Sequence, residues 1–137
     1  MATILQIIYG DQNLSLFGRA VKESDLENKL NEIGPFTVLG PTNLAFRNLT
    51  SLSFDQLLLP VNREKLFNLL SGYIMVGKKM LHDFRHEQKL SMLNSKQVMV
   101  TVKNGSTLLN GAKILSHNRQ GSNGVVHMLD SMYALSQ

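Results

Sequence analysis

An imidazole and a carboxylate stand three residues apart near the end of the chain, in the segment NGVVHMLD at 123–130. Such a pair could act in general acid–base catalysis. In a strand, however, alternate residues face opposite ways, so His127 shares a face with Val125 and Leu129 while Asp130 lies on the other. A histidine between two aliphatic residues is typical of a core position, where a backbone carbonyl or a hydroxyl binds it. We therefore predict structural roles for both residues, with Asp130 accepting amide hydrogen bonds where the strand ends.

A second pair of imidazoles, His82 and His86, lies four residues apart in LHDFRHE, and Asp83 and Glu87 repeat that spacing. On a helix, this spacing would place both imidazoles on one face, where a metal ion could bind. The first histidine is not followed by the glutamate that the zinc-protease motif requires. We expect a solvated helix face with contacts between residues four apart, and we predict no metal site.

Nucleophilic catalysis finds no candidate in this chain. Cysteine is absent, so thiol nucleophiles and thiolate metal sites are excluded. No Gly-x-Ser-x-Gly elbow occurs, and the serines fall in expected turns and caps. Gly34, Gly40 and Gly72 are isolated and do not form a phosphate-binding loop. We predict that the protein is not an enzyme and needs no cofactor.

The net charge of +4 is spread unevenly along the chain. Residues 61–137 carry ten Lys and Arg against four Asp and Glu, whereas residues 1–60 are slightly acidic. Lys78, Lys79, Arg85 and Lys89 are the candidates for binding an acidic polysaccharide or another polyanion. A solvated, solubilising surface would have the same composition. No aromatic residues alternate with the charges, so we do not expect nucleic acid as a partner.

The elements that must position these residues belong to two halves. Residues 1–73 show mainly helical patterns: apolar residues recur at helical spacing over 4–8, 14–21, 25–32, 43–49, 54–59 and 63–73. Capping boxes are predicted at Ser24 with Glu27 and at Ser53 with Gln56, and Thr42 and Asn62 are predicted caps. One buried strand, 36–39, interrupts these helices before Gly40-Pro41.

The second half alternates with the period of strands. Val98, Val100 and Val102 share one face of a strand at 97–103, and Asn104-Gly105 predicts a hairpin turn because both residues tolerate positive φ. Two more Asn-Gly pairs follow, at 110–111 and 123–124. The sequence therefore predicts an α+β fold, with a meander of strands packed on the helical half.

The length of 137 residues suits one domain over 1–137. No apolar run approaches the roughly 18 residues of a membrane span, so we expect no direct membrane insertion. The N-terminus also lacks the pattern of a secretory signal. Asn13, Asn48 and Asn104 open glycosylation acceptor patterns, which a sequence of this composition also produces by accident.

Taken together, these segments resemble the fasciclin-like (FAS1) domain family over nearly the whole chain. FTVLGPTNLAF resembles the first motif of the family and NGVVHMLD resembles the second, in the family's order. The motif residues on which we base the resemblance are Thr42, Asn43, Phe46, Tyr73, His127 and Asp130. The resemblance implies a wedge of two β-sheets with helices packed along one side. It also implies a unit of a larger surface or secreted protein, in an extracellular, cell-surface or periplasmic setting, without enzymatic activity.

This sequence departs from the family at two places. Where the family has Tyr-His between its motifs, this chain has Gly72 and Tyr73. Where adhesive animal members carry an Asp-Ile pair implicated in integrin binding, this chain has Asn118 and Arg119. The carboxylate that could join the metal ion of an integrin is missing, and no Arg-Gly-Asp occurs.

The resemblance favours an adhesion or interaction module that binds a protein or matrix partner through exposed loops. We expect His117, Asn118 and Arg119, in a loop before the last strand, to contact that partner. The alternative is an acidic-polysaccharide binder that uses the basic second half of the chain. Affinity of that second kind should fall steeply with salt.

Overall fold

A computed structural model describes residues 1–48 and 53–133. Six α-helices lie in these residues: α1 (Ile4–Gly10), α2 (Ser15–Glu23), α3 (Leu26–Leu30), α4 (Asn43–Arg47), α5 (Phe54–Leu57) and α6 (Arg63–Ser71). Seven strands accompany them: β1 (Phe36–Pro41), β2 (Ile74–Val76), β3 (Lys89–Ser91), β4 (Gln97–Lys103), β5 (Ser106–Leu109), β6 (Ala112–Gly121) and β7 (Gly124–Leu129). Short 3-10 helices are η1 (Gln12–Leu14), η2 (Pro60–Asn62) and η3 (Leu81–Asp83). The predicted α+β class is confirmed.

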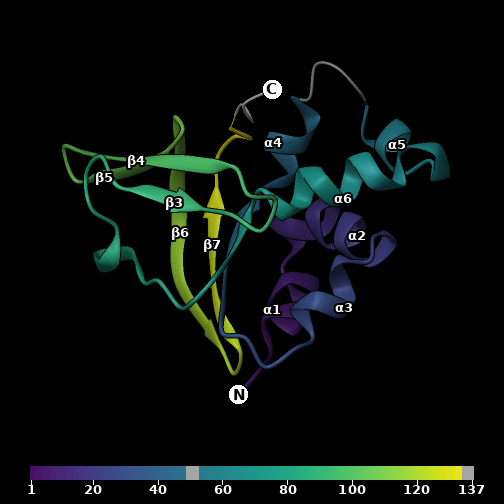
Figure 1. Ribbon diagram of the computed structural model, residues 1–137, viewed down its shortest axis with the longest axis horizontal. Coiled ribbons are helices and arrows are strands. Elements are labelled where there is room, and N and C mark those ends of the chain that lie inside the picture. Colours follow the sequence, from purple (N-terminus) through teal and green to yellow (C-terminus); the bar gives the residue numbers. More distant parts are fainter. Residues whose placement is uncertain (49–52, 134–137) are drawn as a thin grey trace.

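The seven strands form one sheet in the order β2-β1-β7-β6-β5-β4-β3, whereas we expected two separate sheets. Only β1 and β7 run parallel among these pairs; the other neighbours are antiparallel. The register of β6 against β7 shifts twice, between Ile114 and Ser116 and again between Ser116 and Arg119. Such bulges bend a strand and increase its twist. Beyond this bend, β3, β4 and β5 lie across the direction of β6 and β7 (Figure 1).

The helices gather on one side of β1 and β7, opposite β3, β4 and β5, as the resemblance implied (Figure 1). Two hydrophobic cores follow from this arrangement. The helix-side core includes Val126 and Met128 of β7, and the sheet-side core includes Leu129. Strand β7 is buried over its whole length, with its two faces turned to the two cores. The alternation predicted for this strand is therefore confirmed.

The ends of the helices match the sequence prediction in part. The capping box of Ser53 with Gln56 is present at α5. The one predicted at Ser24 is wrong: the Ser24 hydroxyl accepts the N–H of Leu26 and donates to the Val21 carbonyl, because Ser24 closes α2 instead of opening α3. Thr42 is the N-cap residue of α4, but its side chain makes no capping hydrogen bond.

The predicted strand signals hold well. Strands β1 and β4 cover the segments predicted at 36–39 and 97–103, and Asn104-Gly105 turns with φ of 53° and 79°. Val98 and Val100 are buried, although Val102, near the end of the strand, is 39% exposed. Nowhere in 1–48 and 53–133 is there a helix with the length and apolar character needed to cross a membrane.

Candidate functional site

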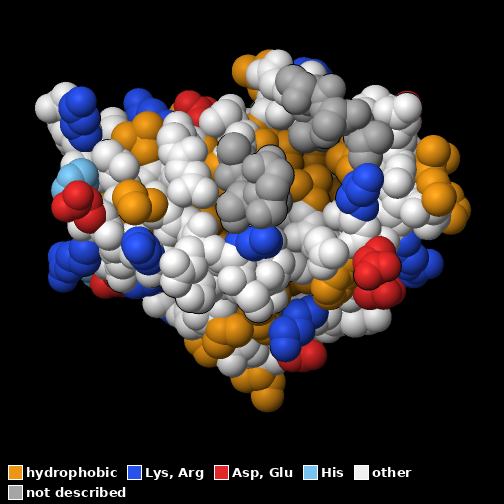
Figure 2. All heavy atoms as spheres, turned by 45° about the horizontal axis from the view of Figure 1, so that its top comes forward, with side chains coloured by type: hydrophobic (Ala, Val, Ile, Leu, Met, Phe, Trp, Pro, Cys, Tyr) orange, Lys and Arg blue, Asp and Glu red, His pale blue; other side chains and the backbone are white. Residues whose placement is uncertain are grey.

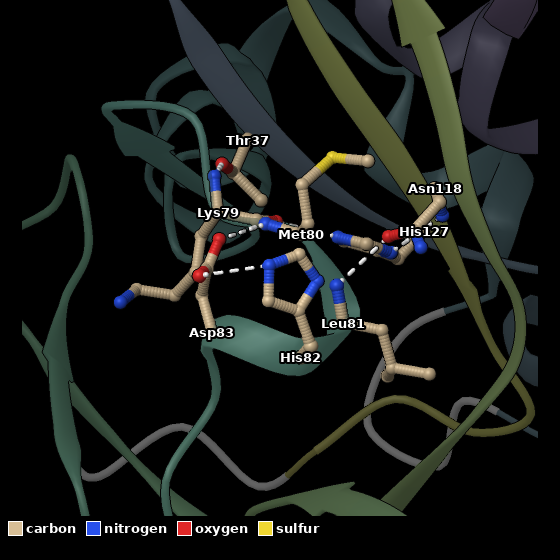
Figure 3. A network of polar contacts seen from close by, with 8 residues as sticks. All are labelled: Thr37, Lys79, Met80, Leu81, His82, Asp83, Asn118 and His127. Atoms are coloured by element: carbon tan, nitrogen blue, oxygen red, sulfur yellow. Dashed lines mark hydrogen bonds and ion pairs between the residues drawn. The ribbon is translucent and has the colours of Figure 1, made fainter.

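The connection from β2 to β3 includes residues 77–83, which we call the 77–83 segment. It contains no strand, and polar side chains of the sheet hold its backbone (Figure 3). From β1, the buried hydroxyl of Thr37 donates to the Gly77 carbonyl at 2.7 Å and accepts the N–H of Lys79 at 2.8 Å. The start of the segment is thus anchored to β1, which lies next to the edge strand β2.

The imidazole of His127 makes the next attachment. Its Nε2 lies 2.8 Å from the Lys79 carbonyl oxygen, which can only accept, so Nε2 carries the proton and donates. Its Nδ1 accepts the backbone N–H of Asn118 at 3.1 Å. The ring of Phe84 packs edge-on against the imidazole, with centroids 5.6 Å apart. His127 is fully buried and binds a backbone carbonyl, which confirms the core role predicted for it.

Asn118 of β6 completes the attachment. Its Oδ1 accepts the N–H of Leu81 at 2.8 Å, and its own φ of 58° places it in the left-handed region, at the second bulge of the strand. Inside the segment, a carboxylate oxygen of Asp83 accepts the N–H of Met80 at 2.9 Å. The side chains of Thr37, His127 and Asn118 therefore hold an irregular backbone in one conformation (Figure 3).

The other residues of the two motifs join distant elements. Asn43 donates to the Gln12 carbonyl and the Ser15 hydroxyl and accepts the N–H of Leu16, which ties α4 to η1 and α2. Phe46 lies in the helix-side core. A carboxylate oxygen of Asp130 accepts the N–H of Lys113 at 2.9 Å, as predicted for the end of the strand.

Two tyrosines close the sheet-side core. Tyr73 stacks on Tyr133 with ring centroids 4.2 Å apart, and the Tyr133 hydroxyl donates to the Gly72 carbonyl. Tyr73, which stands where the family has a histidine, thus fills a core position in this chain.

Comparison with known proteins places this architecture. The sequence profile of the Fasciclin domain matches residues 12–133. The chain belongs to the Fasciclin domain family. A solved pair of FAS1 domains from the insect cell adhesion molecule fasciclin I superposes with a TM-score of 0.74 at 17% identity, over 97% of this chain. Our chain spans 51% of that structure, and the identity supports the shared fold alone.

Sequence relatives of this FAS1 domain come from diverse organisms. Protein sll1483 of Synechocystis is 35% identical over 95% of this chain and 72% of its own length. Transforming growth factor-beta-induced protein ig-h3 of Sus scrofa is 28% identical over 96% of this chain, which spans only 19% of that protein. A heme ligase of Plasmodium falciparum is 28% identical over 93% of this chain and 74% of its own length.

The FAS1 domain does not place His117, Asn118 and Arg119 in a loop, as we had expected, but within the strand β6. The reason is that β6 continues through two bulges to the Asn123-Gly124 turn, which a local reading of SHNRQGSNG could not show. His117 is exposed, whereas Asn118 is used to hold Leu81, and Arg119 forms an ion pair with Asp11 ahead of η1. Of the three residues predicted to contact a partner, His117 is thus exposed, while Asn118 and Arg119 are engaged within the domain.

The predicted polyanion-binding residues also have distinct positions. The ammonium group of Lys78 lies 2.5 Å from Oε1 of Gln120 on β6, and that of Lys79 lies 6.0 Å from the centre of the Phe84 ring. Arg85 is exposed in the turn before β3, and Lys89 pairs with Met99 across β3 and β4. The structure thus brings Lys78 to the part of β6 that follows Asn118.

The helix predicted to carry His82 and His86 does not form. Only Leu81–Asp83 make a single 3-10 turn, and Phe84 is already extended. Nδ1 of His86 accepts the N–H of Val102, while His82 is paired with Asp83 at 3.4 Å. In the described part of the chain, no three His, Asp or Glu side chains group as metal ligands would.

Burial lowers the pKa of His127 below its usual 6.5; the hydrogen bond to Lys79 opposes this shift, and the nearby His117 adds to it. The imidazole is therefore neutral in the folded domain near pH 7. Since the carbonyl of Lys79 and the N–H of Asn118 occupy both ring nitrogens, His127 has no free atom for proton transfer.

The stability of the domain should consequently fall as the pH falls below about 6.5. In that range the imidazole of the unfolded chain binds a proton while the folded one resists protonation. The unfolded state then binds more protons, which destabilises the folded state by up to about 1.4 kcal/mol per pH unit, until the folded pKa is passed. Urea unfolding between pH 7.5 and 5 measures this slope. A His127→Gln variant should lose the histidine's contribution; an unchanged slope in that variant would assign the effect to other groups.

Proposed function

We propose that this FAS1 domain is a non-enzymatic interaction module of an extracellular, cell-surface or periplasmic protein. It binds a protein or matrix partner through the face that the 77–83 segment forms with His117 and Gln120 of β6, here called the clamp face. The observation that carries this proposal is the set of hydrogen bonds from Thr37, His127 and Asn118, which fix an irregular backbone at the surface. A preorganised surface loses less entropy when it binds.

A role in binding is supported over catalysis by how the polar groups are used. The hydroxyl of Thr37 and the imidazole of His127 are both fully buried and are engaged with backbone groups. Groups used in this way stabilise a conformation and do not face a substrate. The name of the Plasmodium relative describes that protein; no proposal for heme chemistry in this chain follows from it.

The chemistry of the clamp face indicates an acidic partner. Lys78 is exposed, and Lys79 is partly buried with its ammonium group over the Phe84 ring. The exposed imidazoles of His82 and His117 add donors. Asp83 is the acidic residue of the segment, and its carboxylate is engaged by Met80 and His82. Complementary charge steers association and fixes orientation.

The proposal predicts that Lys78→Glu combined with Lys79→Glu weakens partner binding at least about tenfold, because two attractions become repulsions. Surface plasmon resonance measures the affinity of the domain for four immobilised probes: collagen, fibronectin, laminin and the domain itself. Lys65→Glu combined with Lys103→Glu, at exposed positions of α6 and β4, changes the charge equally and should leave the affinity unchanged. An equal loss in both variants would mean a nonspecific charge effect and would contradict the clamp face.

One observation favours the polysaccharide alternative. Within residues 1–48 and 53–133, none of Lys78, Lys79, Arg85 and Lys89 forms an ion pair with a carboxylate. Figure 2 shows several Lys and Arg side chains around a histidine at the left end of the molecule, the end that β3–β5 occupy in Figure 1. Heparin binding across a salt series separates the two functions. A steep salt dependence that disappears in Arg85→Ala with Lys89→Ala would favour the polysaccharide.

A further inference from the structure

A recess lies where η1, α4, β6 and β7 meet. Its volume is about 710 Å³, within the usual range of roughly 300 to 1,000 Å³ for small-molecule sites. Residues from η1, α4, β6 and β7 line it, among them Asn13, Thr42, Leu44, Arg47, Leu115 and Ser116. We call this recess the Arg47 pocket.

Several polar side chains in the Arg47 pocket form no hydrogen bond or ion pair with the other residues that the structure describes. Thr42 is only 8% exposed, yet its hydroxyl makes no capping bond; its backbone N–H donates to the Leu129 carbonyl instead. Within the described residues, the side chains of Asn13, Ser116 and Arg47 likewise have no recorded hydrogen bond or ion pair. The neighbouring Asn43 differs, because its side chain is hydrogen-bonded to Gln12, Ser15 and Leu16 and so holds α4 to η1 and α2. Of these four side chains, Thr42 is buried and Ser116 is half-buried, whereas Asn13 and Arg47 are exposed. Polar groups without partners in the fold are available to a ligand.

Two leucines give the Arg47 pocket its apolar surface. Leu44 is 62% exposed and Leu115 is 54% exposed, although both lie next to core positions. Leu115 lies between Ile114 and Ser116, at the first register shift of β6, and has no directly paired residue on β7. The bulge therefore turns this leucine outward, into the pocket. Exposed apolar side chains beside unpaired hydroxyl and amide groups suit a ligand that has both C–H faces and hydroxyls.

The charge of the Arg47 pocket selects the ligand further. Among the residues that the structure describes, Arg47 is the only charged one that lines the pocket, and none of the others carries a carboxylate. Asp11, just before η1, is held by Arg119. A guanidinium group binds a carboxylate with two parallel hydrogen bonds. We propose that the Arg47 pocket binds a hexuronic acid unit of an acidic saccharide, with the carboxylate on Arg47 and the sugar hydroxyls on Asn13, Thr42 and Ser116.

A saccharide fits this pocket better than an extended peptide does. Extended peptides commonly bind by adding a strand to an open sheet edge. Strands β6 and β7 are neighbours inside the sheet, so each already pairs on both sides. The site is also separate from Lys78, Lys79, Arg85 and Lys89, none of which lines the pocket. The inference is therefore independent of the proposed clamp face.

The test uses two probes with the same sugar units, a trimer of galacturonic acid and its uncharged methyl ester, and measures binding by calorimetry. The acid should bind at least about tenfold more tightly than the ester, since a hydrogen bond to a charged group is involved. Arg47→Gln should abolish this difference. Thr42→Val should weaken the acid several-fold while the melting temperature stays unchanged, because the hydroxyl has no partner in the fold. NMR shifts should appear at the methyl groups of Leu44 and Leu115.

Lys65→Gln is the matched control, since it removes one positive charge on α6, outside the pocket, and should leave the affinity unchanged. The proposal is overturned if acid and ester bind equally, or if Lys65→Gln weakens the acid as much as Arg47→Gln does. It is also overturned if the trimer fails to bind at low salt. If an oligoglutamate peptide then shifts the methyl signals of Leu44 and Leu115 instead, the pocket binds an acidic peptide and the saccharide proposal is wrong. These results concern the Arg47 pocket only, because neither Lys78 nor Lys79 of the clamp face lines it.

Discussion

Asn123→Ala is expected to lower the free energy of unfolding by about 3 to 5 kcal/mol, because two buried backbone groups and a third, part-buried one would lose their partner. Oδ1 of Asn123 accepts the N–H of Ile4 at 3.0 Å, and Nδ2 donates to the carbonyls of Leu30 and Glu32, both at 2.9 Å. The residue is 9% exposed. One amide side chain therefore ties the β6–β7 turn to the start of α1 and to the end of α3.

Asn104→Ala is the matched control for this prediction. Asn104 also precedes a glycine in a tight turn, but it is exposed and has no recorded side-chain hydrogen bond among the described residues. Alanine at its φ of 53° should destabilise by about 1 kcal/mol or less. Urea unfolding of both variants measures the difference. If both variants lost the same free energy of unfolding, the loss would come from the turn conformation and not from the hydrogen bonds of Asn123.

His127→Leu is expected to destabilise the domain by about 3 kcal/mol and to release the 77–83 segment. Leucine fills much of the volume but leaves the Lys79 carbonyl and the Asn118 N–H without partners in a buried place. Because Asn118 would then be less firmly held, its contact with Leu81 should weaken as well. Hydrogen exchange at the amides of Lys79 and Leu81 should become about 100-fold faster. Binding to the clamp face should weaken with it.

His82→Leu is the control for this second variant. His82 is also close to Asp83 in the segment, but its side chain is 78% exposed. Its replacement should change the stability by no more than about 0.5 kcal/mol and leave the exchange of Lys79 and Leu81 as it is. If His127→Leu left those two amides equally protected, the imidazole would not be what holds the segment.

Local patterns were reliable where one element decides the outcome. The alternation of Val98 and Val100, the positive φ of Asn104-Gly105 and the capping box of Ser53 with Gln56 are all present. Each depends on residues within a few positions of one another, so the printed sequence contains the whole interaction. The core role of His127 followed in the same way, from the two aliphatic neighbours on its face.

The failures occurred where a distant element competes with a local preference. Ser24 has the spacing of a capping box, but its hydroxyl is engaged by the end of α2. His86 has the spacing of a helical pair, but the 3-10 turn ends at Asp83, and the imidazole accepts from β4. Residues 117–119 read locally as a loop, yet pairing with β7 makes them part of β6. Propensity is overridden when tertiary contacts supply better partners.

By itself the sequence determined the α+β class, the family, the core alternation of β7 and the structural roles of His127 and Asp130, because motif residues and periodicity are local properties. Only the tertiary structure showed what these residues hold. Thr37, Asn118 and His127 come from three strands and meet on the 77–83 segment, and Asn13, Arg47 and Ser116 come from three elements and line one pocket. Contacts between residues 37 to 48 positions apart, such as those of Leu81 and Lys79, depend on the sheet order and on the bulges of β6, and no local period encodes either.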